Sequence, residues 1–273
     1  MQKSDLTTYI KKYYLNPETD RVIWKIKNGQ LIVNCNATGV FATIDADVSD
    51  LPDVEFGVMD TGILLTRLSA LDGDVKFNFN RDRDGNPVQL VMDDGKLKVT
   101  TTLTRISDVQ KFQSGKKSTR AEINLALPTS PFATLEITKE FTSQVNKIKK
   151  ALPDSTVLQL SVENDQLIVV GSNSLNGGAH STQEEVKFTY PITILPTNVV
   201  EGSIPNAVSV FEPTLFNLNL VQSIFTANTD YKTAIVNFYF INQAGLIAGA
   251  ADFIFTAEDC ISTYLVKSLI NNN

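Results

Sequence analysis

The sequence predicts an α+β fold of two similar halves, in which a unit of one helix and several strands occurs about four times. Residues 24–34, WKIKNGQLIVN, alternate apolar and polar residues around an Asn-Gly pair, which is the pattern of a tight β-hairpin. Residues 158–170, LQLSVENDQLIVV, repeat this pattern, and the shared Gln-Leu-Ile-Val begins at Gln30 and again at Gln166. The shift of 136 positions is about half of the 273-residue chain, so the sequence predicts a duplicated unit.

An amphipathic helix is predicted immediately before each hairpin. In both stretches apolar residues recur three or four positions apart, which places them on one helical face. Thr138 precedes the second stretch and is a favourable N-cap. The predicted buried stripes are Leu6, Ile10 and Tyr13 in the first helix, and Phe141, Val145, Ile148 and Leu152 in the second.

Each half also contains a second helix that leads into further strands. Residues 60–71 predict this helix in the first half, followed by a strand at 75–79 and a hairpin that turns at Asp94-Gly95. Residues 213–226 predict its counterpart, followed by strand, turn and strand over 235–255. The predicted organisation is an N-terminal domain at 1–110, a connector at 111–134 and a C-terminal domain at 135–273.

Composition restricts the class of protein. The chain has 24 Lys and Arg against 30 Asp and Glu, a formal net charge of −6. This acidity disfavours a uniformly basic nucleic-acid-binding protein, but it allows one that confines its basic residues to one surface. Without a signal peptide or an apolar run of membrane-spanning length, we expect no membrane association and a cytoplasmic location. Cys35 and Cys260 are expected to be reduced and buried.

The sequence does not predict an enzyme. The single histidine, His180, lies in the Gly-rich stretch GGAHS, which is a poor place to orient a catalytic imidazole. No phosphate-binding glycine motif occurs, and the acidic stretches 81–86 and 93–96 have the composition of turns between strands. We therefore expect no catalytic residues, no metal and no cofactor.

The polar faces of the four predicted helices lack a central carboxylate. For one helix, a solvated face explains this pattern, because lysine is a good helix former. For four helices in an acidic protein, a surface for a polyanion such as nucleic acid is the favoured interpretation. The fourth helix is neutral, and the cations of the other three are Lys11 and Lys12, then Arg67, then Lys139, Lys147 and Lys150.

Several stretches resemble one family, the DNA sliding clamps, which are ring-shaped polymerase processivity factors. The resemblance is closest to the clamp of T-even bacteriophages. The first half carries it in FGVMDTGILLTRLSALDGDVKFNF, and the second in LPTSPFATLEITKEFTSQVNKIKKAL and STVLQLSVENDQLIVVG. STYLVKSLI resembles the last strand of that family, whereas residues 197–210 have no counterpart.

The resemblance implies a ring that encircles duplex DNA and tethers a DNA polymerase. The resemblance implies that each clamp domain has two helices on one face and antiparallel sheets outside. Six such domains close the ring with their helices lining the hole, so two-domain chains imply a homotrimer. The implied partners are duplex DNA without sequence preference, a DNA polymerase and an ATP-dependent clamp loader, in the host cytoplasm if the chain is viral. The implied phosphate contacts are the six cations of the helix faces, Lys11, Lys12, Arg67, Lys139, Lys147 and Lys150.

The resemblance also implies a pocket for partner peptides beside the connector. Its matching positions are Leu127, Pro128 and Phe132, with Tyr264 and Leu265 contributing, although packing of the connector explains these residues equally well. Two other functions stay open. One is a DNA polymerase processivity factor that forms no ring, which would need a strongly basic exposed face. The other is a β-rich structural protein of a virion.

Overall fold

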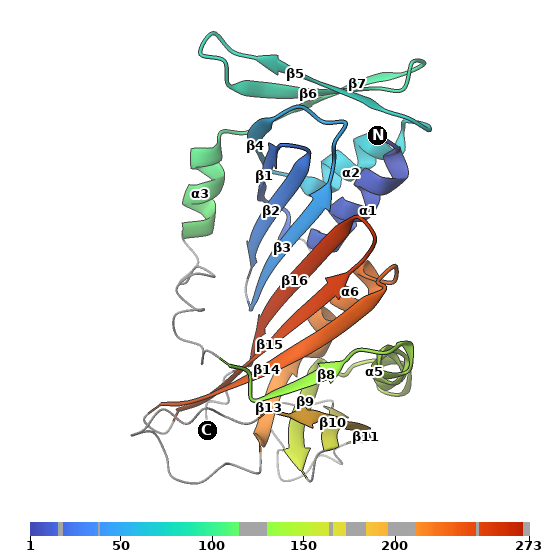
Figure 1. Ribbon diagram of the computed structural model, residues 1–273, viewed down its shortest axis with the longest axis vertical. Helices are drawn as coiled ribbons and strands as arrows, with labels where there is room; N and C mark the ends of the chain where they lie inside the picture. The colour runs from blue at the N-terminus through green and yellow to red at the C-terminus, as the bar shows by residue number, and fades with distance from the viewer. Residues whose placement is uncertain are drawn as a thin grey trace. The chain divides into compact units, whose positions relative to one another are not determined.

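The computed structural model describes residues 1–15, 19–37, 39–114, 130–163, 166–172, 184–195, 211–243 and 246–269. The chain divides into two compact units (Figure 1). Unit 1 consists of Met1–Arg120 with Thr256–Thr263, and unit 2 consists of Ala121–Phe255 with Tyr264–Asn273.

Unit 1 contains two antiparallel sheets. Strands β3, β2, β1 and β4 are neighbours in that order in one sheet, and β5, β6 and β7 form the other. Residues 256–263 add to the first sheet, since the amide of Asp47 on β3 donates to the carbonyl oxygen of Asp259 at 2.9 Å. The elements are α1 (Lys3–Tyr13), β1 (Val22–Lys27), β2 (Gln30–Ala37), β3 (Val40–Asp47), β4 (Val54–Val58), α2 (Thr61–Ser69), β5 (Lys76–Arg81), β6 (Pro87–Asp93), β7 (Lys98–Thr102) and α3 (Ile106–Ser114).

Unit 2 is built in the same way. One sheet has the order β11, β10, β9, β13, and in the other β12, β8, β14, β15 and β16 are neighbours in that order. The elements are β8 (Ala133–Glu136), α5 (Lys139–Ala151), β9 (Val157–Glu163), β10 (Gln166–Ser172), β11 (Glu185–Pro191), β12 (Thr193–Ile194), β13 (Phe211–Asn217), α6 (Leu218–Ala227), β14 (Thr233–Gln243), β15 (Leu246–Thr256) and β16 (Cys260–Lys267), of which β16 contributes residues to both units.

The predicted duplication is confirmed strand by strand. The order β3-β2-β1-β4 of unit 1 recurs in unit 2 as β11-β10-β9-β13, and β5-β6-β7 recurs as β14-β15-β16. Lys27 pairs with Gln30 in the first hairpin, and Glu163 pairs with Gln166 in the second, again 136 positions apart. An isolated bridge between Gly57 and Thr104 corresponds to one between Leu215 and Leu269.

The first hairpin turns at the predicted Asn28-Gly29 pair. Asn28 has φ of 52° and Gly29 has φ of 78°. Two successive positive φ angles define the turn whose twist matches paired strands, and asparagine and glycine adopt them at the lowest cost. This turn therefore sets the register of β1 against β2.

Two stretches differ from the sequence prediction. Residues 213–217, predicted as the start of a helix, belong to strand β13, which pairs with β9 through Phe216 and Leu158. α6 begins only at Leu218, where the Asn217 side chain accepts from the Leu220 amide and caps the helix. Residues 106–114 form α3, which spans the predicted boundary at 110/111 between the N-terminal domain and the connector and packs on β4 and β1 of unit 1.

Aromatic side chains fill the core of each unit. In unit 1 the Trp24 indole N–H donates to the Tyr13 hydroxyl at 3.1 Å, and the Trp24 ring lies 5.5 Å from that of Phe56. In unit 2 the centroid of the Phe225 ring lies 6.2 Å from that of Phe141 and 5.8 Å from that of Phe253.

Helix α3 lies on the opposite side of the β1–β4 sheet from α1 and α2 (Figure 1).

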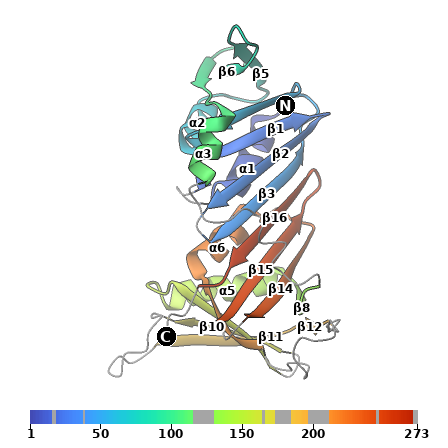
Figure 2. The ribbon, with the colours of Figure 1, turned by 90° about the vertical axis from the view of Figure 1, so that its left-hand side faces the viewer.

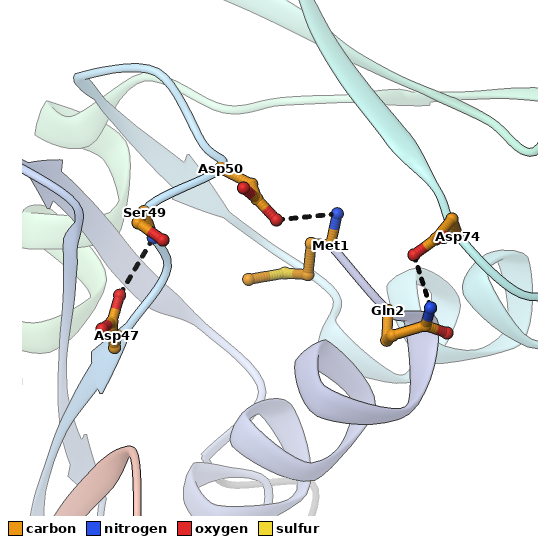
Figure 3. A network of polar contacts seen from close by, with 6 residues as sticks. All are labelled: Met1, Gln2, Asp47, Ser49, Asp50 and Asp74. Carbon is orange, nitrogen blue, oxygen red and sulfur yellow. Dashed lines mark hydrogen bonds and ion pairs between the residues drawn. The ribbon is translucent and has the colours of Figure 1, made fainter.

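The start of the chain is joined to unit 1 by polar contacts (Figure 3). The α-amino group of Met1 lies 3.1 Å from the Asp50 carboxylate, and the side-chain amide of Gln2 donates to the Asp74 carboxylate at 2.6 Å. The Val75 amide donates to the Met1 carbonyl oxygen at 3.0 Å. Because these contacts precede Lys3, they fix the position from which α1 begins.

Candidate nucleic-acid interface

Helix α5 turns an apolar face to unit 2 and a basic face to solvent. Phe141, Val145 and Ile148 are buried on one side of the helix. At 100° per residue, the exposed Lys139, Lys147 and Lys150 fall on the opposite side, with Ser143 and Asn146 among them. None of these three lysines forms an ion pair with a residue that the structure describes.

The fourth lysine of α5 has a different environment. The Lys149 ammonium donates to the Ser155 carbonyl oxygen at 2.6 Å. This contact ties the end of α5 to the segment that enters β9. Lys149 therefore has a local structural contact, whereas the other three lysines are exposed.

Helix α6 extends the same surface without adding charge. The Gln222 side chain donates to the Asn146 side chain at 3.4 Å, so the polar faces of the two helices adjoin. Figure 2 shows the ribbons of α5 and α6 next to each other in unit 2. Asn219 and Thr226 are exposed beside Gln222. The joint surface is therefore a lysine-bearing helix next to a neutral one.

Charge is distributed unevenly within unit 2. The unit contains seven lysines and no arginine, and four of the lysines lie on α5. Its twelve Asp and Glu residues outnumber them. Glu140 is the single acidic residue of α5, and it lies in the first turn, where a carboxylate interacts favourably with the helix dipole. Unit 2 thus concentrates its positive charge on one helix.

In unit 1, the second helix is held in place by two carboxylates. The Asp60 side chain accepts from the Ile63 amide at 2.7 Å, and Asp20 accepts from the amides of Thr61 at 2.6 Å and Gly62 at 3.2 Å. At the other end, the Lys3 ammonium lies 3.4 Å from the Ser69 carbonyl oxygen. These contacts place α2 beside α1 and leave one face of each helix exposed.

The exposed faces of unit 1 carry less positive charge than the sequence indicates. Lys11 is exposed, as expected from the helical wheel. Lys12 was expected on the polar face of the helix, but its side chain is only 1% exposed. It adjoins the buried side that contains Tyr9 and Tyr13, so packing covers the flank on which it lies.

Arg67 is also only half exposed. Its guanidinium donates to the Thr101 hydroxyl on β7, so the side chain bends toward the second sheet of unit 1. The exposed face of α2 consists of Ile63, Thr66 and Ser69, of which Ile63 is 47% exposed. α2 therefore presents a neutral face.

The residues of the expected peptide pocket occupy different environments. Leu127 and Pro128 lie outside the described residues, as does His180. Phe132 is half-buried, and its amide donates to the Phe238 carbonyl oxygen at 2.8 Å. Tyr264 and Leu265 are 0% and 1% exposed. They are core residues rather than part of an exposed pocket wall. The Tyr264 hydroxyl accepts a hydrogen bond from the buried side-chain amide of Asn228 at 2.9 Å.

The described part of the chain offers little for other chemistry. Within it, no group of three or more His, Cys, Asp or Glu side chains could hold a metal ion. Cys35 and Cys260 are buried, and neither forms a disulfide with a described residue. Among the described helices, none is long and apolar enough to cross a membrane.

Sequence reasoning missed two residues that organise this surface. Tyr190 on β11 contacts the cap of α5, with its hydroxyl 2.6 Å from that of Thr138. The alternating stretch EVKFTYP indicates a strand there, but the neighbour of its tyrosine depends on tertiary structure. Gln222 lies in the stretch predicted as the fourth helix, but its contact with Asn146, 76 positions away in sequence, has no local signal.

The fold is similar to that of solved proliferating cell nuclear antigens. The crystal structure of Proliferating Cellular Nuclear Antigen from Entamoeba histolytica matches with a TM-score of 0.61 and 12% sequence identity, over 98% of this chain and 96% of that one. A PCNA2-PCNA3 complex from Sulfolobus tokodaii matches with a TM-score of 0.60 and 10% identity, over 97% and 96%. No protein-family model matches the sequence, and no curated protein matches it. Because the structural matches cover nearly the whole chain, this protein has the α+β clamp fold of PCNA.

Proposed function

We propose that this protein is a DNA sliding clamp, a non-enzymatic factor that encircles duplex DNA and tethers a DNA polymerase. The observation that carries the proposal is the lysine face of α5 in an otherwise acidic unit. A clamp fold over the whole chain supports the same function. An acidic exterior would discourage DNA from binding elsewhere on the molecule.

The proposed DNA contacts are Lys11, Lys139, Lys147 and Lys150. Their side chains are exposed, so they can approach phosphates without losing an existing ion pair among the described residues. Lysine contacts to phosphate depend on salt and not on base sequence, as sliding requires. We assign Lys12 and Arg67 a supporting role, because one is buried and the other is bonded to Thr101.

The repeat supports a ring made from copies of this chain. β11 of unit 2 is the counterpart of β3 of unit 1. In the other pair of sheets, β7 of unit 1 is the counterpart of β16. Residues at the start of β16 lie beside β3, whereas β11 and β7 are each at the end of their sheets in the described chain. Exposed edge strands favour pairing. We infer that β7 of one copy joins β11 of the next in a head-to-tail ring.

Two repeats per chain favour three copies in the ring, and the T-even bacteriophage type remains the proposed subclass. An ATP-dependent clamp loader is the proposed agent that opens the ring. For the polymerase, we retain Phe132 as the proposed docking residue, together with the connector residues Leu127 and Pro128. Tyr264 and Leu265 would support this site from the core.

The first test is the mass of the protein in solution over a range of concentrations and salt. Three copies of the 30.0 kDa chain give about 90 kDa. The second is retention on nicked circular DNA compared with the same DNA made linear, after loading. A ring stays on the circle and slides from the free ends. A 30.0 kDa monomer at high concentration, or equal retention on both DNA forms, contradicts the proposal.

A further inference from the structure

The first turn of α5 is tied to strand β11 by a pair of side chains. The Thr138 hydroxyl accepts from the Phe141 amide at 3.1 Å and so caps the helix. The same hydroxyl lies 2.6 Å from the hydroxyl of Tyr190 on β11. The Thr138 hydroxyl therefore caps α5 and contacts β11 at the same time.

Aromatic packing supports this link. The Phe141 ring lies 5.2 Å from the Tyr190 ring and 6.1 Å from Phe188, both in edge-on geometry. Phe141 is buried, whereas Tyr190 and Phe188 are half-buried. The two β11 aromatics thus hold the start of α5 from one side.

The link joins two features of the proposed function. On one side, β11 is the last strand of the order β11-β10-β9-β13. On the other side, Lys139 follows Thr138 directly as the first residue of α5. A change in the position of Tyr190 would therefore alter the position of Lys139, because only Thr138 lies between them.

We propose that Tyr190 is a positioning residue for the lysine face of α5. It holds the helix start through Thr138, and a second copy seated on β11 would fix this link. The proposal rests on the proposed function, in which β11 joins copies of the chain and α5 faces DNA.

The test compares Tyr190→Phe with Tyr231→Phe in the full chain. The first variant keeps the ring that contacts Phe141 and removes only the hydroxyl. The second is a matched control, because the buried Tyr231 hydroxyl has no hydrogen-bond partner among the described residues. Amide hydrogen exchange is measured at Phe141 and at Thr142, whose amide donates to the Thr138 carbonyl oxygen at 3.1 Å. DNA affinity is measured on the same samples.

Loss of one net hydrogen bond predicts about fivefold faster exchange at both amides in Tyr190→Phe. DNA affinity should fall while solution mass stays unchanged, and Tyr231→Phe should match the wild type in all three measurements. Thr138→Ser should keep slow exchange at the Phe141 amide because it keeps the hydroxyl, and Thr138→Val should lose it.

Equal exchange at the Phe141 amide in Tyr190→Phe and the wild type would overturn the proposal. So would faster exchange with unchanged DNA affinity, because the helix start would then not position the lysines. Failure of the ring is a separate result. If the wild-type chain is a monomer, yet Tyr190→Phe opens the first turn and weakens DNA binding, the positioning role stands and the ring falls.

Discussion

Gly171 on β10 lies directly against Ile148 on α5, so closely that a Cβ atom at position 171 would overlap the Ile148 Cγ2 methyl group. Ile148 is fully buried and lies on the side of α5 opposite the exposed lysines. The absence of a side chain at position 171 therefore sets how closely the lysine-bearing helix approaches its sheet.

Gly171→Ala should destabilise unit 2. The new methyl group requires Ile148 or α5 to shift, and overpacking of this kind costs about 1–3 kcal/mol. The reduced freedom of the unfolded chain offsets only about 0.4–1 kcal/mol. Urea unfolding should give a net loss of about 1–2 kcal/mol. The matched test is Gly171→Ala combined with Ile148→Ala, which removes the Cγ2 methyl group. The double variant should lose less stability than the sum of the two single variants, and strictly additive effects would contradict the contact.

The sequence predicted those features that depend on local periodicity. The hairpin at Asn28-Gly29 and the buried stripe of α5 each follow from neighbours within a few positions, so both were predicted correctly. Strand β13 was misassigned because its apolar residues run directly into α6. Its pairing with β9, which joins residues 49 to 60 positions apart in sequence, decides its structure.

The helix α3 was missed although its sequence contains a signal. Ile106, Val109 and Phe112 recur every three residues in ISDVQKFQS, which favours a helix. The polar stretch that follows led to the prediction of a connector. The burial of Lys12 had no local signal, because packing around α1 determines it.

Gly57→Ala should loosen α3 from its sheet. A Cβ atom at position 57 would lie 2.7 Å from side-chain atoms of both Thr104 and Val109. Since Val109 is the fully buried residue of α3, the helix should move outward, at a cost of about 1–3 kcal/mol. Tryptic cleavage after Lys111 should become faster in Gly57→Ala. Val109→Ala, which removes the buried anchor of α3, is the positive control. Unchanged cleavage in Gly57→Ala would show that the packing of α3 does not require a glycine at position 57.

Asp94 should remain ionised to unusually low pH. Its carboxylate accepts from the backbone amides of Leu97, Asp72 and Lys96 at 2.7–2.8 Å, which lowers its pKa to about 2. A lowered pKa stabilises the folded chain above the unfolded value of 3.8, and this contribution disappears as pH falls toward 2. The difference in Tm between wild type and Asp94→Asn should therefore shrink between pH 4 and pH 2. Asp84→Asn, in another exposed turn, is the control; a constant Asp94→Asn difference over this range contradicts the assignment.

Tyr9 should titrate at high pH. Burial raises its pKa most, and Asp259, Asp5 and Asp47 add to this, to about 12. Because the unfolded value is 10.0, the unfolded chain loses this proton first, so stability should fall as pH rises from 10 toward 12. Ultraviolet titration should show an ionisation near pH 12 that is absent in Tyr9→Phe. An identical titration curve for the variant would contradict the assignment.

Lys149 and Lys147 allow stability to be separated from DNA binding on a single helix. Lys149→Ala removes the hydrogen bond to the Ser155 carbonyl oxygen, so it should lower the free energy of unfolding by about 1 kcal/mol and leave the salt dependence of DNA binding unchanged. Lys147→Ala should leave stability within about 0.5 kcal/mol. It should reduce the slope of log affinity against log salt by roughly 0.9 for each phosphate that the variant no longer neutralises. The two variants carry the same change of net charge, so each is the control for the other. Equal slopes in both would mean that the exposed face of α5 does not contact DNA, because only the exposed lysine is expected to release counterions.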